Sequence, residues 1–319
     1  MYTLQRYILM TLDPVHIGTG SYRLGRVDLS IVREPGTNLP KIPGTSLSGA
    51  ARVYAAMRYE KPQCAGQGQG DSDEGRHCGL PTCPICYTFG SINGTEGGNA
   101  GRVSIADAQL LLFPVHSLAG PVWVSTAGRM KEAGFKVAAP DVERGEFATT
   151  LPDWDRRLNL GWLLLTPKKG DIEVEPADQL KDETIWKAVA GRLVLVDDSL
   201  LSQIVNSNLE VRTSVSIDPL TGAAKKGALF IYEAIPRASW LWSDIVEDDY
   251  PSGTKPWPVS KKFNGEKDNA GESLGEKWER PLDVVKSGLA LAEYLGVGGM
   301  GTRGFGRLKV VGNWKVSHG

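Results

Sequence analysis

The sequence lacks the two bulk features that most readily indicate a function, a strong net charge and a long apolar run. Its 36 Lys and Arg residues nearly balance 37 Asp and Glu residues, so the net charge is −1, whereas free-standing nucleic-acid binders usually carry a basic excess. No apolar run approaches the ~18 residues of a membrane helix, and Tyr7–Leu12 is too short for a signal peptide. We therefore expect a globular, cytoplasmic protein with no membrane partner.

The sequence also lacks the short motifs of several enzyme classes. It contains no G-x-S-x-G, no H-E-x-x-H and no Walker A motif, which argues against the corresponding hydrolases, metalloproteases and NTPases. The Gly-rich stretch Gly296–Gly306 does contain G-x-G-x-x-G, but it lies between a helix pattern and a strand pattern, the reverse of a dinucleotide site. It is either a tight turn or a loop whose backbone N–H groups, together with Arg303, can approach phosphates.

Charge is distributed unevenly along the chain. Residues 1–60 hold 7 basic and 4 acidic residues, residues 286–319 hold 5 and 1, and the middle segment holds 24 and 32. Two basic ends can hold a polyanion locally while the whole chain stays near neutral. If the fold brings both ends into one sheet, they would form one basic surface.

Cysteine is scarce and clustered, since all four residues, Cys64, Cys78, Cys83 and Cys86, lie within 23 positions. In a reducing compartment such clustering indicates a metal site more than disulfides. Four soft ligands predict a closed, structural zinc site in a loop that cannot build its own core, with His77 as an alternative ligand. The other interpretations are four unrelated thiols or, less favoured, a redox pair.

The order of elements predicts an α+β fold, because the helices are few and do not alternate with the strands. Helices are expected from Thr45 or Ser46, as N-cap, to Tyr59, over 198–205 after Asp197, and from Pro281 to Gly296. Strands are expected over 2–12, 27–33, 103–113, 122–125, 162–165, 193–196, 209–217, 228–235 and 306–311. Residues 126–160 give a mixed signal.

Two groups of residues could carry chemistry outside the cysteines. Asp28 lies on the polar face of its expected strand, downstream of His16 in a Gly-rich loop, and could hold Mg²⁺ or position a 2′-hydroxyl beside a phosphodiester. The expected hairpin 206–235 combines Arg212, Lys225, Lys226, Phe230 and Tyr232, which suits stacking on bases and contact with phosphates. The alternatives are an exposed strand residue and an ordinary surface hairpin.

Four ordered segments resemble a known family: Leu24–Glu34, Ile42–Arg52, Cys83–Gly90 and Arg102–Leu118. Together they resemble the RAMP (repeat-associated mysterious protein) superfamily of CRISPR–Cas systems, and most of all the repeated backbone subunit of type III complexes of the Cmr (III-B) kind. Gly227–Pro236 and the terminal Gly-loop fit the same subunit in order. The resemblance is thin over 126–190 and absent over 244–280.

The resemblance implies a single domain over 1–319. Its fold would be an RRM-like, ferredoxin-like palm that carries a thumb β-hairpin and large loop insertions, one of them a zinc-binding loop. The implied boundaries are a palm from 1–59, 102–125, 190–205 and 281–319, a zinc or finger loop at 60–101 and a thumb at about 206–235. Residues 244–280 are polar and rich in glycine and proline, which predicts an inserted loop.

The resemblance also implies an activity. Copies would stack head-to-tail along a CRISPR RNA, together with other type III subunits, and each thumb would kink the duplex of guide and target RNA. Target RNA would be cleaved by metal-dependent transesterification at Asp28, with Mg²⁺ or another divalent cation. The alternatives are a structural guide-binding subunit without nuclease activity, and a zinc-stabilised interaction module without an RNA role.

The residues implied for these roles fall into three sets. Asp28 would be catalytic, assisted by His16, Glu233 and, more weakly, Tyr232. The RNA-binding set would be Thr45, Ser46, Ser48, Arg52, Lys225, Lys226, Phe230, Gly298, Gly299, Gly301, Thr302 and Arg303. The zinc ligands would be the four cysteines.

Overall fold

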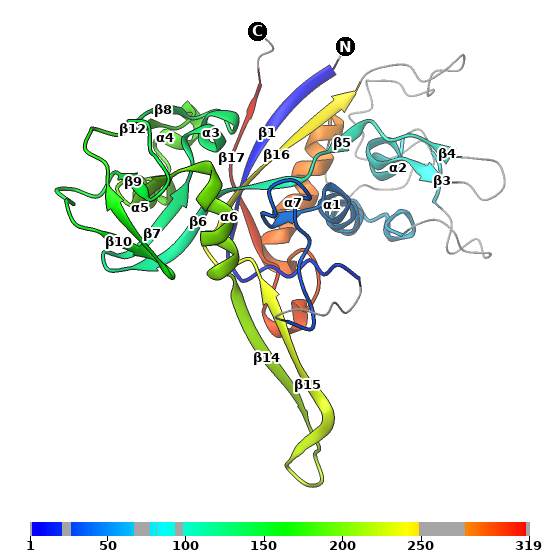
Figure 1. The fold of residues 1–319 in the computed structure, drawn as a ribbon. Helices are drawn as coiled ribbons and strands as arrows, with labels where there is room; N and C mark the ends of the chain where they lie inside the picture. The colour runs from blue at the N-terminus through cyan, green and yellow to red at the C-terminus, as the bar shows by residue number, and fades with distance from the viewer. Residues whose placement is uncertain are drawn as a thin grey trace.

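A mixed sheet with a projecting hairpin dominates the molecule (Figure 1). The computed structural model describes residues 2–20, 27–66, 77–80, 82–92, 98–248 and 278–316. The two ends of the described chain lie together in the sheet, on the side of the molecule away from the tip of the hairpin (Figure 1).

The palm is a four-stranded antiparallel sheet backed by two helices. Its strands are β1 (Tyr2–Thr11), β6 (Ala108–Ser117), β16 (Trp240–Asp248) and β17 (Leu308–Lys315), and its helices are α1 (Gly44–Arg58) and α7 (Pro281–Leu295). The strands lie in the order β6-β16-β1-β17, and all neighbours are antiparallel. The chain order β1-α1-β6-β16-α7-β17 is the β-α-β-β-α-β pattern of a ferredoxin-like palm, as predicted. Short strands β2 (Lys41–Ile42) and β5 (Val103–Ile105) pair with β6 and β16.

Both faces of the palm sheet are covered. In β1, Tyr7 packs on the helical side with Leu289, whereas Ile8 packs on the other side with Trp240. The helices pack closely because Gly288 has no side chain: a Cβ there would lie 2.1 Å from the carbonyl oxygen of Ala51. The strand alternation thus buries apolar residues on both faces.

A side lobe extends the same sheet beyond β6. Its strands follow in the order β7-β13-β9-β11-β10, with two parallel pairs, β13 with β7 and β11 with β9. The bounds are β7 (Gly120–Ser125), α3 (Ala127–Glu132), β8 (Lys136–Ala138), β9 (Glu146–Thr149), β10 (Leu158–Leu160), β11 (Leu163–Pro167), β12 (Glu173–Glu175), α4 (Asp178–Lys181), α5 (Thr184–Ala190) and β13 (Leu193–Val196). The stretch 126–160, which gave a mixed signal, belongs to this lobe.

The thumb is a two-stranded hairpin, as predicted. Helix α6 (Asp198–Ser207) leads into β14 (Glu210–Ile217), which pairs with β15 (Ala224–Ala234) and projects from the body (Figure 1). The Asp197 side chain caps α6 by accepting from the Ser199 N–H, as expected from the sequence. Strand β15 begins four residues earlier than predicted because Ala224 still pairs with Ile217.

The finger carries the cysteines and packs against the two palm helices. Its described elements are η1 (Pro62–Cys64), α2 (Pro84–Phe89), β3 (Ser91–Ile92) and β4 (Gly98–Asn99). Trp278, which precedes α7, Val284 of α7 and Ala55 of α1 join the cysteines in one small core.

Three local predictions are wrong. Residues 27–33 form only isolated bridges, because their backbone pairs with separate partners such as Tyr232 and Pro40 instead of one strand. Thr45 and Ser46 do not cap α1; the N-cap is Pro43 and the Gly44 N–H donates to Asp107 Oδ1 at 2.8 Å.

The third error concerns the loop predicted over 244–280. Residues 240–248 form β16, held by pairing with both β1 and β6, and residues 249–277 lie outside the described residues. Across the described part of the chain, no helix has the length and apolar character needed to cross a bilayer.

Candidate functional site

Asp28 lies at the base of the thumb, on the edge of β15 that β14 leaves open. Its backbone N–H donates to the Ile231 carbonyl at 3.0 Å, and its Oδ2 accepts from the Ile231 N–H at 2.7 Å. The side chain is exposed, and its other oxygen makes no hydrogen bond within the described residues. One oxygen fixes the carboxylate, and the other faces solvent as an acceptor.

His16 contacts the same strand, β15, two residues beyond the partner of Asp28, and is only 5% exposed. Its Nδ1 is 2.7 Å from the Glu233 carbonyl oxygen, which can only accept, so Nδ1 carries the proton and Nε2 is the acceptor. The ring meets Tyr232 edge to face at 6.1 Å between centroids. The imidazole is therefore held in one tautomer and orientation.

Glu233 is buried at 7% exposure, and its carboxylate already has partners. Oε1 accepts from the Ile31 N–H at 3.0 Å and lies 2.8 Å from the guanidinium of Arg33. It anchors the segment that carries Asp28, and its predicted catalytic role stays a prediction.

Aromatic rings join the thumb to the C-terminal Gly-loop. Phe230 and Tyr232 of β15 lie 5.8 Å apart, and Tyr232 meets Phe305 at 5.5 Å. A guanidinium covers each end: Arg303 lies 5.3 Å from the Phe230 ring and Arg212 lies 4.7 Å from the Phe305 ring. This ladder of rings, which we call the aromatic ladder, fixes the loop against the thumb and leaves both cations at the surface.

The Gly-loop passes directly over His16. The Gly299 N–H donates to the His16 carbonyl at 3.0 Å, and a Cβ on Gly298 would lie 2.3 Å from Ile17 Cδ1. Close approach therefore requires glycine at 298. The predicted binding residues of this loop are all exposed: Gly298, Gly299, Gly301, Thr302 and Arg303, the last three forming η4 (Gly301–Arg303).

The N-terminus of α1 already faces a carboxylate. Asp107 accepts from the Gly44 N–H and pairs with Lys41. Burial raises the pKa of Asp107, but its bonds to Lys41 and Gly44 outweigh this, and the net pKa is lowered. Thr45 is exposed, and Ser46 and Ser48 are half-buried beside it. The side chains of these residues are open to a ligand, whereas the Gly44 N–H is already bonded to Asp107.

Arg52, predicted to bind phosphate, points into the finger. Its Nε donates to the Cys64 carbonyl at 2.8 Å, and its terminal nitrogen is 3.2 Å from His77 Nδ1. The guanidinium therefore links α1 to the cysteine loop, which no spacing in the sequence could indicate.

The four cysteines converge as predicted. The Sγ atoms of Cys64, Cys78, Cys83 and Cys86 all lie within 4.8 Å of one another. Sγ–Sγ distances are 3.4 Å from Cys64 to Cys78, 3.7 Å from Cys78 to Cys86 and 3.8 Å from Cys83 to Cys64. Tetrahedral zinc with Zn–S bonds near 2.3 Å places its sulfurs about 3.8 Å apart. These separations fit zinc and exceed a disulfide bond.

Electrostatics also favour a cation among the sulfurs. Contact with Cys64 and the other sulfurs, together with burial, raises the pKa of the Cys83 thiol, whereas hydrogen bonds from Cys78 and the other sulfurs lower the pKa of Cys64. Contact with Cys64 also raises the pKa of Cys86. Four thiolates cannot share this space without a compensating positive charge, which a zinc ion supplies.

His77 is not a fourth ligand. Its Nδ1 accepts from the Ile92 N–H at 3.0 Å, so Nε2 carries the proton and donates to the Gly66 carbonyl at 2.7 Å. Both ring nitrogens are used, which leaves Cys64 to complete the set. Within the described residues, the cysteines are the one group of three or more potential metal ligands, and Asp28 belongs to no such group.

The fold thus separates the predicted residues into regions. Asp28, His16, Glu233, Phe230 and the Gly-loop meet at the thumb base, where both basic chain ends contribute. Lys225 is exposed toward the thumb tip, and the side chain of Lys226 lies outside the described part. Sequence reasoning assigned no role to Phe305, Arg33 or Asn206, which contact this site; the available signals were that Phe305 lies in the Gly-rich stretch and that Arg33 is near Asp28 in the sequence.

The fold agrees with comparisons to known proteins. The RAMP superfamily matches over residues 8–309. The chain belongs to the RAMP superfamily. It is 29% identical over 254 residues to the CRISPR system Cmr endoribonuclease Cmr4 of Pyrococcus furiosus, covering 75% of this chain and 79% of that protein.

Solved RAMP structures share the fold across the whole chain. A crystal structure of oligomeric Cmr4 from Pyrococcus furiosus has a TM-score of 0.57 at 21% identity, covering 99% of this chain and 100% of that one. The apo state of a type III-B Cmr-beta complex has a chain with a TM-score of 0.61 at 14% identity, covering 98% and 97%. At these identities the likeness concerns the fold.

Proposed function

We propose that this chain is a backbone subunit of a type III-B CRISPR effector complex and cleaves guide-paired target RNA at Asp28. The observation that carries the proposal is an exposed carboxylate, fixed by one oxygen, at the base of a projecting hairpin and beside a cationic loop. The relative with 29% identity is named an endoribonuclease, which supports the same activity.

The reaction is a transesterification. The target 2′-oxygen attacks the adjacent phosphorus, the bond to the 5′-oxygen breaks, and the 2′-hydroxyl proton ends on the leaving oxygen. Asp28, through its free oxygen, orients the hydroxyl or accepts its proton. A divalent cation bound there would neutralise charge on the phosphate. Asp28 would supply one carboxylate and the RNA the other ligands, as Mg²⁺ often permits.

The RNA path follows the exposed groups around Asp28. Arg303, Thr302 and the Gly-loop backbone contact guide phosphates, and Arg212 adds a second cation on the thumb. Phe230, Lys225 and Lys226 extend the contact along the thumb, and Thr45, Ser46 and Ser48 provide hydroxyl groups near α1. Kinking the duplex at the thumb brings the 2′-oxygen into line with the phosphate.

Partners and metal complete the proposal. The subunit stacks head-to-tail with copies of itself along the CRISPR RNA, next to other type III subunits; related Cmr4 is described as oligomeric, and a Cmr-beta complex as bound to cognate target RNA. One structural Zn²⁺ bound by the four cysteines orders the finger.

The test is target cleavage by the assembled complex with Asp28→Ala in every copy. We expect guide and target binding to be retained and the cleavage rate to fall at least ~10²-fold, the range of a lost acid–base group. Asp155→Ala, which removes an exposed carboxylate in the lobe, is the matched control and should leave the rate unchanged. Full cleavage by the Asp28→Ala complex would favour a purely structural, guide-binding subunit.

A further inference from the structure

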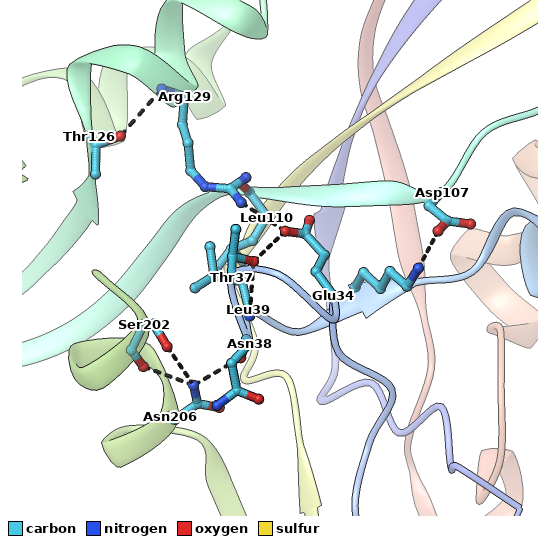
Figure 2. A network of polar contacts seen from close by, with 11 residues as sticks. Glu34, Thr37, Asn38, Leu39, Asp107, Leu110, Thr126, Arg129, Ser202 and Asn206 are labelled. Carbon is cyan, nitrogen blue, oxygen red and sulfur yellow. Dashed lines mark hydrogen bonds and ion pairs between the residues drawn. The ribbon is translucent and has the colours of Figure 1, made fainter. Parts of the chain in front are cut away.

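Asn206, at the end of α6, joins three parts of the chain that meet near Asp28. Its Oδ1 accepts from Arg33 Nε at 2.9 Å, and its Nδ2 donates to the Asn38 carbonyl at 3.0 Å. Nδ2 also donates to the Ser202 carbonyl one turn earlier, at 2.8 Å. Figure 2 shows the amide of Asn206 directed at Asn38, with Ser202 on the same helix. Donors and acceptors leave the amide only one orientation.

Arg33 connects Asn206 to the thumb. Its guanidinium contacts Asn206 through Nε, the Ile31 carbonyl through one terminal nitrogen at 3.0 Å, and Glu233 through the other at 2.8 Å. Glu233 in turn accepts from the Ile31 N–H. A planar guanidinium suits such a three-way contact, which lysine cannot make.

Backbone bonds tie the first part of the segment 27–33 to β15, from Asp28 and Leu29 to Ile231, and the contacts of Arg33 fix its other end. The segment forms isolated bridges instead of a strand, and Asp28 sits five residues before Arg33. On its other side, the turn after Arg33 is held by Glu34, which pairs with Arg129 of α3 at 3.2 Å (Figure 2). Asn206 therefore ties both ends of this turn, at Arg33 and Asn38, to the helix that leads into β14.

We propose that Asn206 is a positioning residue for the cleavage site: through Arg33 and Glu233 it holds the segment bearing Asp28 in register with the thumb. This inference rests on the proposed function of Asp28. Asn206 itself touches no RNA in the proposal. It sets where the Asp28 carboxylate lies relative to the kink, and a displacement of about 1 Å can cost about 10²-fold in rate.

The experiment measures single-turnover cleavage at saturating target, target Kd and thermal midpoint for assembled complexes carrying Asn206→Ala in every copy. We expect the rate to fall about tenfold, with the Kd within twofold of wild type. Asn208→Ala is the matched control, because among the described residues the Asn208 side chain bonds to α6 alone, at Ile204 and Ser207, and it should cleave at the wild-type rate.

A second variant keeps the proposal testable if Asn206→Ala does not assemble. Arg33→Lys preserves the charge beside Glu233 but loses the bond to Asn206, and it should show the same rate loss at unchanged Kd. A wild-type rate at saturation in either variant, with only the thermal midpoint lowered, would mean that Asn206 is merely structural. If Asp28→Ala abolishes cleavage but Asn206→Ala and Arg33→Lys both cleave fully, only the inference about Asn206 is overturned. If Asp28→Ala cleaves fully, the proposed function is overturned first.

Discussion

The finger and the base of the thumb are both built from irregular chain, but different forces order them. In the finger, short elements surround four sulfurs, and the small core there includes the cysteines themselves. At the thumb base, backbone bonds to β15, the pair of Arg33 with Glu233 and the aromatic ladder hold every segment. One region would depend on a bound ion for its order, whereas the other depends on contacts within the chain.

This difference assigns the two regions different tasks. A closed four-sulfur site would leave a bound zinc ion no open position, so its role would be structural and a chelator would remove the order of the finger with the ion. The thumb base keeps exposed groups, Asp28 and Arg303, on a frame of buried ones, which is how a reactive site is held in place. The predictions below separate the two regions, from the largest expected effect to the smallest.

Zinc removal should have the largest effect, and it should act on the finger. Purified wild-type protein is expected to contain one zinc per chain by elemental analysis, and Cys83→Ser to contain far less. Because structural zinc contributes roughly 10–16 kcal/mol of apparent binding energy, the finger should become sensitive to protease between Tyr59 and Arg102. Ile85→Val, which trims a buried residue between two ligands, should keep its zinc. Wild-type protein free of metal would contradict the site.

Breaking the aromatic ladder should affect the thumb base without affecting zinc. Phe305 is 2% exposed between Tyr232 and Arg212, so Phe305→Ala should lower the free energy of unfolding by about 3–5 kcal/mol. Phe305→Leu, which retains most of the volume, should cost clearly less. Denaturant unfolding with parallel zinc analysis measures both quantities. Equal stability of Phe305→Ala and wild type would show that the ladder is not a structural element.

The contacts of Arg52 determine whether the residue supports the finger or binds guide RNA. Substitution of Arg52 should have the smallest effect of the three. Arg52→Lys keeps the charge but cannot reach the Cys64 carbonyl and His77 together. We expect zinc affinity, measured by competition with a chelator, to fall about 10–100-fold, as for other groups that orient ligands. Guide affinity should not change.

The control for Arg52 lies on the same helix. Arg58 donates to the Ser287 carbonyl, so Arg58→Lys should alter neither zinc affinity nor guide affinity. If Arg52→Lys instead weakened guide binding and left zinc unchanged, the phosphate contact expected from the sequence would be right.

The sequence predicted the structure best where local periodicity and composition determine it. Helix α7 runs from Pro281 to Leu295 as expected, because proline begins and glycine ends it, and the cysteine spacing predicted the cluster. Local patterns failed where distant partners decide. Residues 240–248 form a strand because β1 pairs with them, despite their charged end, and the direction of Arg52 depends on a loop that packs against α1. Nothing near Asn206 signals its contact with Arg33 across 173 positions.

Asp28, the proposed cleavage residue, is bonded to β15 near the base of the hairpin, and the turn of the hairpin lies at its other end. The turn of the hairpin, from Asp218 to Ala223, lies at the surface and is closed by local hydrogen bonds to Asp218. None of the hydrogen bonds described for this turn reaches the body of the molecule. Each added pair of residues per strand would lengthen the thumb by about 7 Å without moving its base. Reach and chemistry can therefore vary independently in evolution, so relatives of this chain could change their step along a nucleic acid while keeping one cleavage geometry.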